Sequence, residues 1–415
     1  MLKNADKFQP RYQLHEYPGR KPWYVIRNYI NEYSKPGDTI LDPFCGSGVV
    51  LCESLITRRK ALGVDIDPVA VFISGMTCIS PIQIKQLKKD FQKIAAKAKD
   101  KIYEIYAVPD LCDRCGGKMF ASRVARLPGE LALKATCLEC NKHQDSIISL
   151  SEWEIEGDIE IPYWYPKDIK LPSDIQGNIK YLHKLYTIRN LKALSILWQS
   201  LNLVKDEIIR ELFRLCFSAN LSKSSSMNVP KKTGKGWTSA DYEVYNIPDN
   251  FIEFNVWEGF ANKFQLCLQA KSQTNDLIGD YYNYETFKLF KSSSEKMSFL
   301  SDDSVDYVLT DPPYADLVKY HDRNFVRRAW LGYEHEYKFS IYPVMMKNVF
   351  KEITRVLKSE GYVSIMLKDT SKEFRRDILE IAGSSGLVYD KTDRRNLGYG
   401  NKHVDHVINL KKGKI

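Results

Sequence analysis

Apolar and polar positions follow strand-like and helix-like spacing in turn along the first eighty residues. The segment 38–42, DTILD, is a short apolar run that leads into FCGSG, and 49–62, VVLCESLITRRKAL, carries apolar side chains at helical spacing. The segment 63–67, GVDID, again has the composition of a strand. This pattern predicts a strand, a glycine-containing turn, a helix and a second strand.

Helical spacing dominates the middle of the chain. After Pro81, apolar residues recur every three or four positions in a lysine-rich stretch, which predicts one long amphipathic helix. Its apolar positions are Ile84, Leu87, Phe91, Ile94, Ala98, Ile102 and Ile105. Further helices are predicted near 186–203, 205–220 and 256–272, whereas 152–175 has no clean periodicity and is predicted to be irregular.

Strand signals return towards the end of the sequence. They are TFKLF, VDYVLT, GYVSIML, LVYDKT and VDHVINL, with helical patterns at 342–357 and 372–385 between them. Strands and helices that alternate on both sides of a long interruption indicate one doubly wound α/β sheet with a large insertion. We expect a first core part at 1–80, an insertion at 81–280 and a second core part at 281–415.

The composition narrows the class of protein. Hydrophobic residues make up 44% and charged residues 27% of the chain, which is sufficient for a packed core and excludes a disordered protein. No apolar run is long enough for a signal peptide or a membrane span, so a cytoplasmic protein without a membrane partner is expected. The net charge of +9 permits binding to a phosphate backbone but does not require it.

The sequence LDPFCGSG places two glycines where the first strand turns into a helix. Gly46 and Gly48 let a ligand approach the backbone closely, although many such turns need glycine only for packing. Asp65 follows at the end of the next strand, where doubly wound folds place a carboxylate on ribose hydroxyls. Asp67, which precedes Pro68, is better explained as a helix cap. The pattern favours a nucleoside cofactor.

The tetrapeptide DPPY follows the hydrophobic strand VDYVLT. An exocyclic amine is a poor nucleophile, because its lone pair is delocalised into the ring, and it needs hydrogen-bond acceptors on its hydrogens. Asp311 and the carbonyl of Pro312 supply acceptors, Pro313 stiffens the loop, and Tyr314 is placed to stack on an extruded base. The alternative is a loop stiffened by proline without a catalytic role.

Together, LDPFCGSG and DPPY resemble the cofactor and catalytic motifs of the amino-group DNA methyltransferases. The stretches DPPYADLVKYHDRNFVRRAWLG and RELFRLCFSANLSKSSSMN further resemble the adenine-specific DNA methylases that contain a zinc ribbon. This resemblance implies a Rossmann-like class I methyltransferase sheet, doubly wound with an antiparallel last strand, and a large, mostly helical insertion that contains the ribbon. It also implies S-adenosyl-L-methionine as the cofactor.

The resemblance assigns further residues to the cofactor. The segment HEYPGRKPWYVIRNYI is similar to the part of these enzymes that closes over the methionine end of the cofactor, although an amphipathic helix with a basic start explains it equally well. The cofactor residues that the resemblance implies, together with those named above, are Lys21, Pro22, Asp42, Phe44, Gly46, Gly48, Asp65 and Ile66.

Four of the nine cysteines form two CxxC pairs. Cys112 and Cys115 are separated by twenty-one residues from Cys137 and Cys140, a spacing suited to one tetrahedral structural Zn²⁺ in a ribbon at about 108–145. A redox pair is the competing interpretation. His143 is a possible substitute ligand, although four cysteines already suffice.

The insertion lies between the two motifs, where the resemblance implies target-recognition material. Its Ser-, Gly-, Pro- and Lys-rich segment 222–237 predicts a flexible basic loop that approaches phosphates, with a purely solvated loop as an equal alternative. The candidate DNA-contacting residues are Lys223, Lys231, Lys232, Lys235 and Trp237. The expected partners are DNA, double-stranded, and a cognate restriction endonuclease of a restriction-modification system.

Four alternatives bear on the reaction. Cytosine C5 methylation needs a nucleophilic cysteine that attacks the ring, and the enzymes of that kind present it in a Pro-Cys dipeptide, which this sequence lacks. Between amines, DPPY favours N6 of adenine, and N4 of cytosine stays open. Enzymes that methylate N2 of guanine in RNA have a similar loop but usually carry an RNA-binding domain before the cofactor motif. The last alternative is a non-catalytic zinc-ribbon protein that binds nucleic acid.

Overall fold

The computed structural model describes residues 9–17, 19–149, 160–173, 175–229, 245–313, 324–333, 340–368, 370–396 and 404–413. The chain divides into two compact units. Unit 1 comprises Met1–Ile82, Ala270–Val318 and His335–Ile415, and unit 2 comprises Gln83–Gln269 and Lys319–Glu334. The assignment of a core at 1–80 and 281–415 and an insertion at 81–280 stays a prediction.

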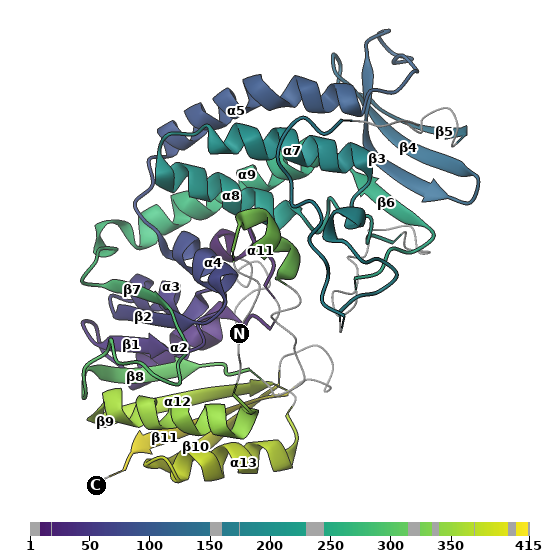
Figure 1. Ribbon diagram of the computed structural model, residues 1–415. Helices are drawn as coiled ribbons and strands as arrows, with labels where there is room; N and C mark the ends of the chain where they lie inside the picture. The colour runs from purple at the N-terminus through teal and green to yellow at the C-terminus, as the bar shows by residue number, and fades with distance from the viewer. Residues whose placement is uncertain are drawn as a thin grey trace. The chain divides into compact units, whose positions relative to one another are not determined.

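The described residues of unit 1 form a seven-stranded sheet in the order β10-β11-β9-β8-β1-β2-β7 (Figure 1). Strands β1, β2, β7, β8 and β9 are mutually parallel, and β11 runs antiparallel between β9 and β10. This topology confirms the predicted Rossmann-like, doubly wound fold with an antiparallel last strand. The strands are β1 Thr39–Asp42, β2 Lys60–Asp65, β7 Phe287–Lys291, β8 Val305–Thr310, β9 Leu357–Lys368, β10 Leu387–Asn396 and β11 Val404–Lys412.

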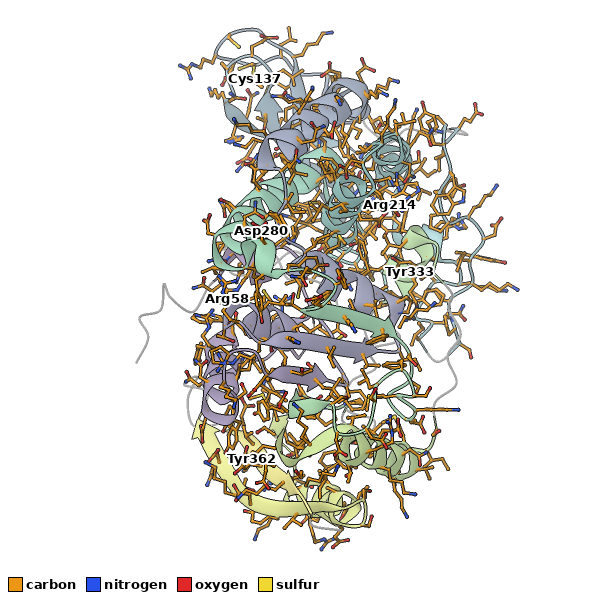
Figure 2. All side chains as sticks on the ribbon, turned by 90° about the vertical axis from the view of Figure 1, so that its left-hand side faces the viewer. Arg58, Cys137, Arg214, Asp280, Tyr333 and Tyr362 are labelled. Carbon is orange, nitrogen blue, oxygen red and sulfur yellow. The ribbon has the colours of Figure 1, made fainter. Side chains whose placement is uncertain are left out.

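Both faces of this sheet are covered by helices, which explains why the central strands β1 and β8 are mostly buried. Successive side chains of a strand point to opposite faces. Ile40 packs with helices α2 and α3, whereas Leu41 packs with α12 and α13 on the other face. Figure 2 shows side chains on both faces of the sheet. The helices are α2 Trp23–Tyr33, α3 Val49–Ile56, α4 Pro68–Cys78, α12 Tyr342–Val356 and α13 Lys372–Gly383.

The predicted boundary between the first helix and the second strand is wrong. Helix α3 ends at Ile56, and β2 already begins at Lys60. Arg58 adopts a left-handed conformation with φ of 63°, which stops the helix and reverses the chain. The apolar spacing of 49–62 therefore spans a helix, a turn and the start of a strand.

Unit 2 combines helices with an antiparallel sheet. The long helix predicted after Pro81 is α5, Ile84–Ile105, and the other helices are α7 Ile188–Asn202, α8 Glu207–Asn220, α9 Val256–Leu277 and α11 Phe325–Leu331. The described strands form a sheet in the order β5-β4-β3-β6. They are β3 Met119–Leu127, β4 Glu130–Cys137, β5 His143–Ser149 and β6 Phe251–Phe254. The sequence analysis named none of these four strands, and β6 has only four residues, too few to show a clear alternation.

Helix α11, just after the segment that contains DPPY, belongs to unit 2. Its Trp330 is fully buried in an aromatic cluster, with ring centroids 5.2 Å from Phe217 and 6.3 Å from Trp198. Asn220 at the end of α8 donates to the carbonyl of Val256 at 3.1 Å. These contacts hold α11, α8 and α9 together within the unit.

None of the described helices is long and apolar enough to cross a membrane. The expectation of a cytoplasmic location stays a prediction.

Candidate functional site

The predicted cofactor turn connects β1 to α3 and has a backbone that requires glycine. Gly46 and Gly48 have φ angles of 49° and 78°, and a Cβ at Gly48 would lie 2.9 Å from the Cα of Ser74. The ring of Tyr17 lies against Gly46, because a Cβ there would be 3.0 Å from its Cε1. The turn is therefore tight, and the segment before α2 lies over it.

Asp65, at the end of β2, holds this turn in place. Its Oδ2 accepts a hydrogen bond from the backbone N–H of Gly46 at 2.9 Å, and its Oδ1 accepts from that of Asp67 at 3.0 Å. Burial raises the pKa of the Asp65 carboxyl to about 7. Asp67 caps α4 by accepting from the N–H of Val69, which confirms its predicted capping role. The ribose-binding role of Asp65 stays a prediction.

Asp42 links the cofactor turn to the strand that carries the predicted catalytic loop. Its Oδ1 accepts from the hydroxyl of Thr310 at 2.8 Å and from the N–H of Phe44 at 3.1 Å. Asp42 and Thr310 are both buried, and burial raises the pKa of Asp42 to about 7. Thr310 directly precedes Asp311, so this bond sets the position of the catalytic loop against the turn. The sequence did not single out Thr310.

Lys21 and Asp311 form an ion pair. The Nζ of Lys21 lies 2.5 Å from Oδ2 of Asp311, and Lys21 is buried, with 7% of its surface exposed. The sequence analysis predicted Lys21 to bind the cofactor and Asp311 to take part in the reaction. The structure brings these two side chains into contact. This charge-assisted contact fixes the position of the Asp311 carboxylate at the end of β8.

The other predicted residues take varied positions. Pro22 is the N-cap of α2, Phe44 packs against the core on the α12 side, and Ile66 is half-buried between β2 and α4. Pro312 is buried and Pro313 is half-buried at the end of β8. Tyr314 lies outside the described residues.

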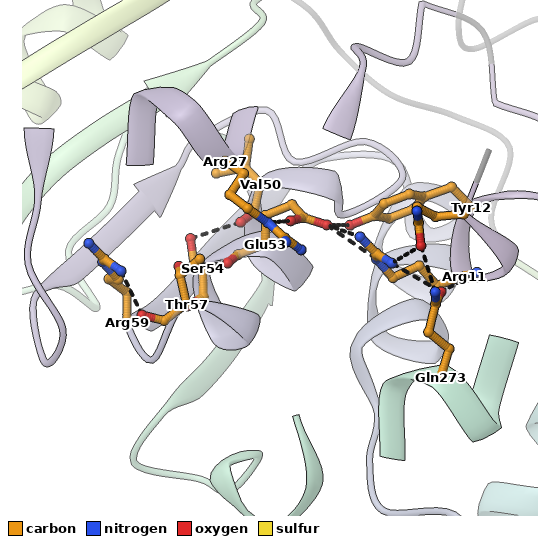
Figure 3. Close-up of polar contacts among 10 residues, drawn as sticks. Arg11, Tyr12, Arg27, Val50, Glu53, Ser54, Thr57, Arg59 and Gln273 are labelled. Atoms are coloured by element: carbon orange, nitrogen blue, oxygen red, sulfur yellow. Dashed lines mark hydrogen bonds and ion pairs between the residues drawn. The ribbon is translucent and has the colours of Figure 1, made fainter. Parts of the chain in front are cut away.

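A buried carboxylate that the sequence analysis missed fixes the N-terminal segment to α3. Glu53 has no exposed surface, and its oxygens accept from Arg11, Tyr12 and Arg27 (Figure 3). The contacts measure 2.7 Å to Nη2 of Arg11, 2.6 Å to the hydroxyl of Tyr12 and 2.6 Å to Nε of Arg27. The available signal was a glutamate within the otherwise apolar helix VVLCESLI. This network holds the segment that carries Tyr17 and Lys21.

Arg20 ties the same segment to the glycine turn. Its Nε donates to the Ser47 hydroxyl at 3.3 Å, and its Nη1 and Nη2 donate to the carbonyls of Tyr12 and His15. Ser47 is the residue between the two glycines. The N-terminal segment is therefore bonded to the turn through Arg20 and to helix α3 through Glu53.

The four paired cysteines converge in unit 2. The Sγ atoms of Cys112, Cys115, Cys137 and Cys140 all lie within 4.8 Å of one another. Cys112 and Cys140 are 3.6 Å apart and Cys115 and Cys137 are 3.5 Å apart, close to the ~3.8 Å separation expected for four sulfurs at tetrahedral Zn–S distances. Cys137, labelled in Figure 2, ends β4, and its Sγ accepts from the N–H of Glu139 at 3.4 Å. This arrangement can hold a tetrahedral metal ion.

The predicted DNA-contacting lysines are only partly described. The Nζ of Lys223 lies 4.8 Å from the ring centroid of Phe254, so this ammonium packs on an aromatic face. Lys231, Lys232, Lys235 and Trp237 lie outside the described residues. Their role stays a prediction.

The sequence of this chain is similar to known DNA methylases. Residues 3–74 match the model of the N6/N4 methyltransferase family, described as DNA methylase. The Type II methyltransferase M.MjaII of Methanocaldococcus jannaschii is 20% identical over 364 residues, 78% of this chain and 63% of that protein. This match confirms the predicted resemblance to amino-group DNA methyltransferases.

Two shorter matches have higher identity. The Type II methyltransferase M.EcaI of Enterobacter cloacae is 39% identical over 12% of this chain and 11% of that protein. The DNA adenine methyltransferase YhdJ of Escherichia coli is 37% identical over 14% of this chain and 20% of that protein. The chain thus spans less than two thirds of the length of each of these curated relatives.

Removing the carboxylate of Glu53 is expected to destabilise unit 1. Glu53→Ala leaves two guanidinium groups and a phenol without their acceptor in a buried site, and breaking a buried ion pair costs about 3–5 kcal/mol. Urea unfolding measures the loss. The matched control is Glu32→Ala, which breaks the exposed pair with Lys391 and should cost at most about 1 kcal/mol. Equal stabilities for the two variants would contradict the assigned role of Glu53.

The raised pKa of Asp42 predicts a pH dependence of stability. The unfolded chain releases this proton near pH 3.8, whereas the folded protein keeps it up to about pH 7. The folded state therefore binds more protons between these values, and the free energy of unfolding falls as the pH rises from about 4 to about 7. Above pH 7 both the folded and the unfolded states have released the proton, so Asp42 causes no further decrease in the free energy of unfolding.

Asp42→Asn should make this decline shallower, because asparagine keeps the Oδ1 acceptor for Thr310 and Phe44 but does not titrate. Urea unfolding of the wild type and the variant between pH 4 and pH 8 measures the two slopes. Asp302→Asn, at an exposed position, serves as the control and should keep the wild-type slope. An unchanged slope in Asp42→Asn would argue against a raised pKa at this carboxyl.

Proposed function

We propose that this chain transfers the methyl group of S-adenosyl-L-methionine to an exocyclic amine of a DNA base, namely N6 of adenine. The observation that carries the proposal is the bond between Asp42 and Thr310, which places the glycine turn and Asp311 side by side. Strand order reverses at β1, between β2 and β8, and ligands of doubly wound sheets bind outside the carboxyl ends of strands at such a point. Both motifs begin at this edge.

The residues of the turn suit a nucleoside cofactor. Gly46 and Gly48 leave the backbone open to close approach, and Asp42 and Asp65 bring two carboxyl groups to the ends of β1 and β2. Lys21, Pro22, Phe44 and Ile66 complete the proposed binding set. When bound, the cofactor supplies an electrophilic methyl group on a sulfonium.

Asp311 and Pro312 are proposed to act on the amine. The carboxylate oxygens of Asp311 accept hydrogen bonds from the amine hydrogens, and the carbonyl of Pro312 accepts a second one. These acceptors would stabilise the positive charge on nitrogen as its lone pair bonds to the methyl carbon, while the carbon–sulfur bond breaks and its electron pair stays on sulfur. The nitrogen would then release one proton to water. Pro313 stiffens the loop, and Tyr314 stacks on the extruded base. Lys21 acts as a positioning residue, because its ammonium contacts the Asp311 carboxylate and holds it in place.

The choice of substrate rests on the relatives. YhdJ is named a DNA adenine methyltransferase, and M.MjaII and M.EcaI are named Type II methyltransferases. We propose double-stranded DNA as the substrate, a role in a restriction-modification system, and a cognate endonuclease as a partner. N4 of cytosine is the alternative target.

The four-cysteine cluster is proposed to bind one structural Zn²⁺. The four sulfurs lie at the mutual distances that tetrahedral coordination needs, and an all-cysteine site is closed to substrates. Cys112, Cys115, Cys137 and Cys140 would join the loop after α5 to the end of β4.

Methyl transfer depends on Asp311 in this proposal. Incorporation of a tritiated methyl group from S-adenosylmethionine into unmethylated duplex DNA should fall by at least about 100-fold in Asp311→Ala, because a developing charge loses its acceptor. Asp311→Asn serves as a second variant that keeps one acceptor and the side-chain volume. Asp302→Ala, at an exposed acidic position of unit 1, should retain wild-type activity. A folded wild type that binds the cofactor but transfers no methyl group to DNA would refute the proposal. A parallel assay with RNA as the substrate tests whether RNA is methylated instead.

Metal analysis checks the zinc proposal. Protein purified under reducing conditions should contain about one equivalent of zinc, and Cys137→Ser should contain much less, since a buried ligand is lost. Cys267→Ser changes a buried cysteine outside the cluster and should keep its zinc. A wild-type protein that is folded, reduced and free of zinc would contradict the proposal.

A further inference from the structure

Helix α5 carries a dense set of exposed lysines that the proposed function does not yet use. Lysine recurs at every fourth position from Lys85 to Lys101, and one further exposed lysine lies at Lys88. We define the lysine face of α5 as its exposed lysines, which are Lys85, Lys88, Lys89, Lys93, Lys97 and Lys101. Each step of four residues turns by about 40° around the axis, so these side chains spread over the exposed half of the helix.

The opposite face of α5 is firmly packed, which fixes the lysines outward. Phe91 stacks on Phe264 of α9 with centroids 3.8 Å apart, and the Tyr103 hydroxyl donates to Glu258 at 2.5 Å. Leu87, Ile94, Ala98 and Ile102 are buried with them. Figure 1 shows α5 at the outer side of the helices of unit 2.

The lysine face has little compensating negative charge. Helix α5 contains seven lysines and three acidic residues, so it carries +4 of the net charge of +9. Among the described residues, the one ion pair of the lysine face joins Lys93 to Asp90, and Asp90 is buried. The lysines from Lys85 to Lys101 stand in an i,i+4 row of like charges, a spacing that destabilises a helix by a few tenths of a kcal/mol per pair.

Other charged helices of the chain neutralise their surface. In α8, Glu211 pairs with Arg210 and Arg214. In α13, Arg376 pairs with Asp377 and Glu380. Helices α8 and α13 thus neutralise part of their surface charge by ion pairs, whereas among the described residues the lysine face of α5 has one such pair for six exposed lysines.

We propose that the lysine face of α5 binds the phosphate backbone of the DNA duplex, an inference that rests on the proposed function. A helix of 22 residues is about 33 Å long, which matches about ten base pairs at 3.4 Å each. Lysine offers a mobile point charge rather than the fixed fork that reads guanine, so these residues supply affinity and not sequence recognition. The lysine face thus adds a DNA contact that is separate from the predicted basic loop.

The test removes charge from the lysine face without touching the proposed catalytic residues. A five-lysine variant changes each lysine that lacks an ion pair to glutamine, which has a similar helix propensity. The positions are Lys85, Lys88, Lys89, Lys97 and Lys101. A second variant changes the same five residues to arginine and keeps the charge. A third changes five exposed lysines of unit 1 to glutamine, namely Lys35, Lys60, Lys288, Lys347 and Lys351.

Fluorescence anisotropy with a 30-base-pair duplex, measured at several salt concentrations, gives the dependence of the binding constant on salt. Each lost phosphate contact makes the slope of log binding constant against log salt concentration less negative by about 0.9. In the α5 glutamine variant this slope should therefore become less negative by about 2 to 4. The arginine variant and the unit 1 variant should keep the wild-type slope. At saturating DNA, kcat should be unchanged in all three, while KM for DNA rises in the α5 glutamine variant alone.

The outcomes separate this inference from the proposed function. A wild type that binds and methylates DNA, together with a wild-type slope in a folded α5 glutamine variant, would overturn the role of α5 and leave the methyltransferase proposal standing. A wild type that neither binds nor methylates DNA would overturn both. A slope change confined to an RNA duplex of the same length would also contradict the inference.

Discussion

The hydrogen bond between Thr310 and Asp42 is the contact on which the rest of the site depends. It joins two neighbouring parallel strands, β1 and β8, at the edge where strand order reverses. Because both groups are buried, neither has water as an alternative partner, and the bond defines one relative position for the two loops that follow. The glycine turn leaves from one strand and Asp311 from the other. In the proposed reaction, the methyl donor and the amine meet at this junction.

The N-terminal segment completes this arrangement from the side opposite the strands. Glu53 binds two arginines and a tyrosine of the first thirty residues, Arg20 contacts Ser47, and Lys21 reaches Asp311. Ionic contacts and hydrogen bonds, and not apolar packing alone, therefore hold the N-terminal segment beside the turn. Charged groups held in this way keep fixed geometry, since each has its partners inside the protein.

Much of the fold and half of the site could be predicted from the sequence, for physical reasons. The glycine turn and the proline loop have strong local signatures, because only particular residues adopt such backbones, and the four-cysteine cluster follows from spacing. The contacts of Glu53, Thr310 and Lys21 could not be predicted from the sequence. They join residues up to 290 positions apart and depend on which side chains the topology brings together. Strand β6 was not predicted because its four residues are too few to show a clear alternation.

The central claim is that this junction methylates an exocyclic amine of DNA. Mass spectrometry of nucleosides from duplex DNA incubated with the protein and S-adenosylmethionine tests it most directly. The account predicts N6-methyladenine as the new nucleoside. The appearance of 5-methylcytosine, or of no methylated nucleoside with a folded protein that binds the cofactor, would contradict it.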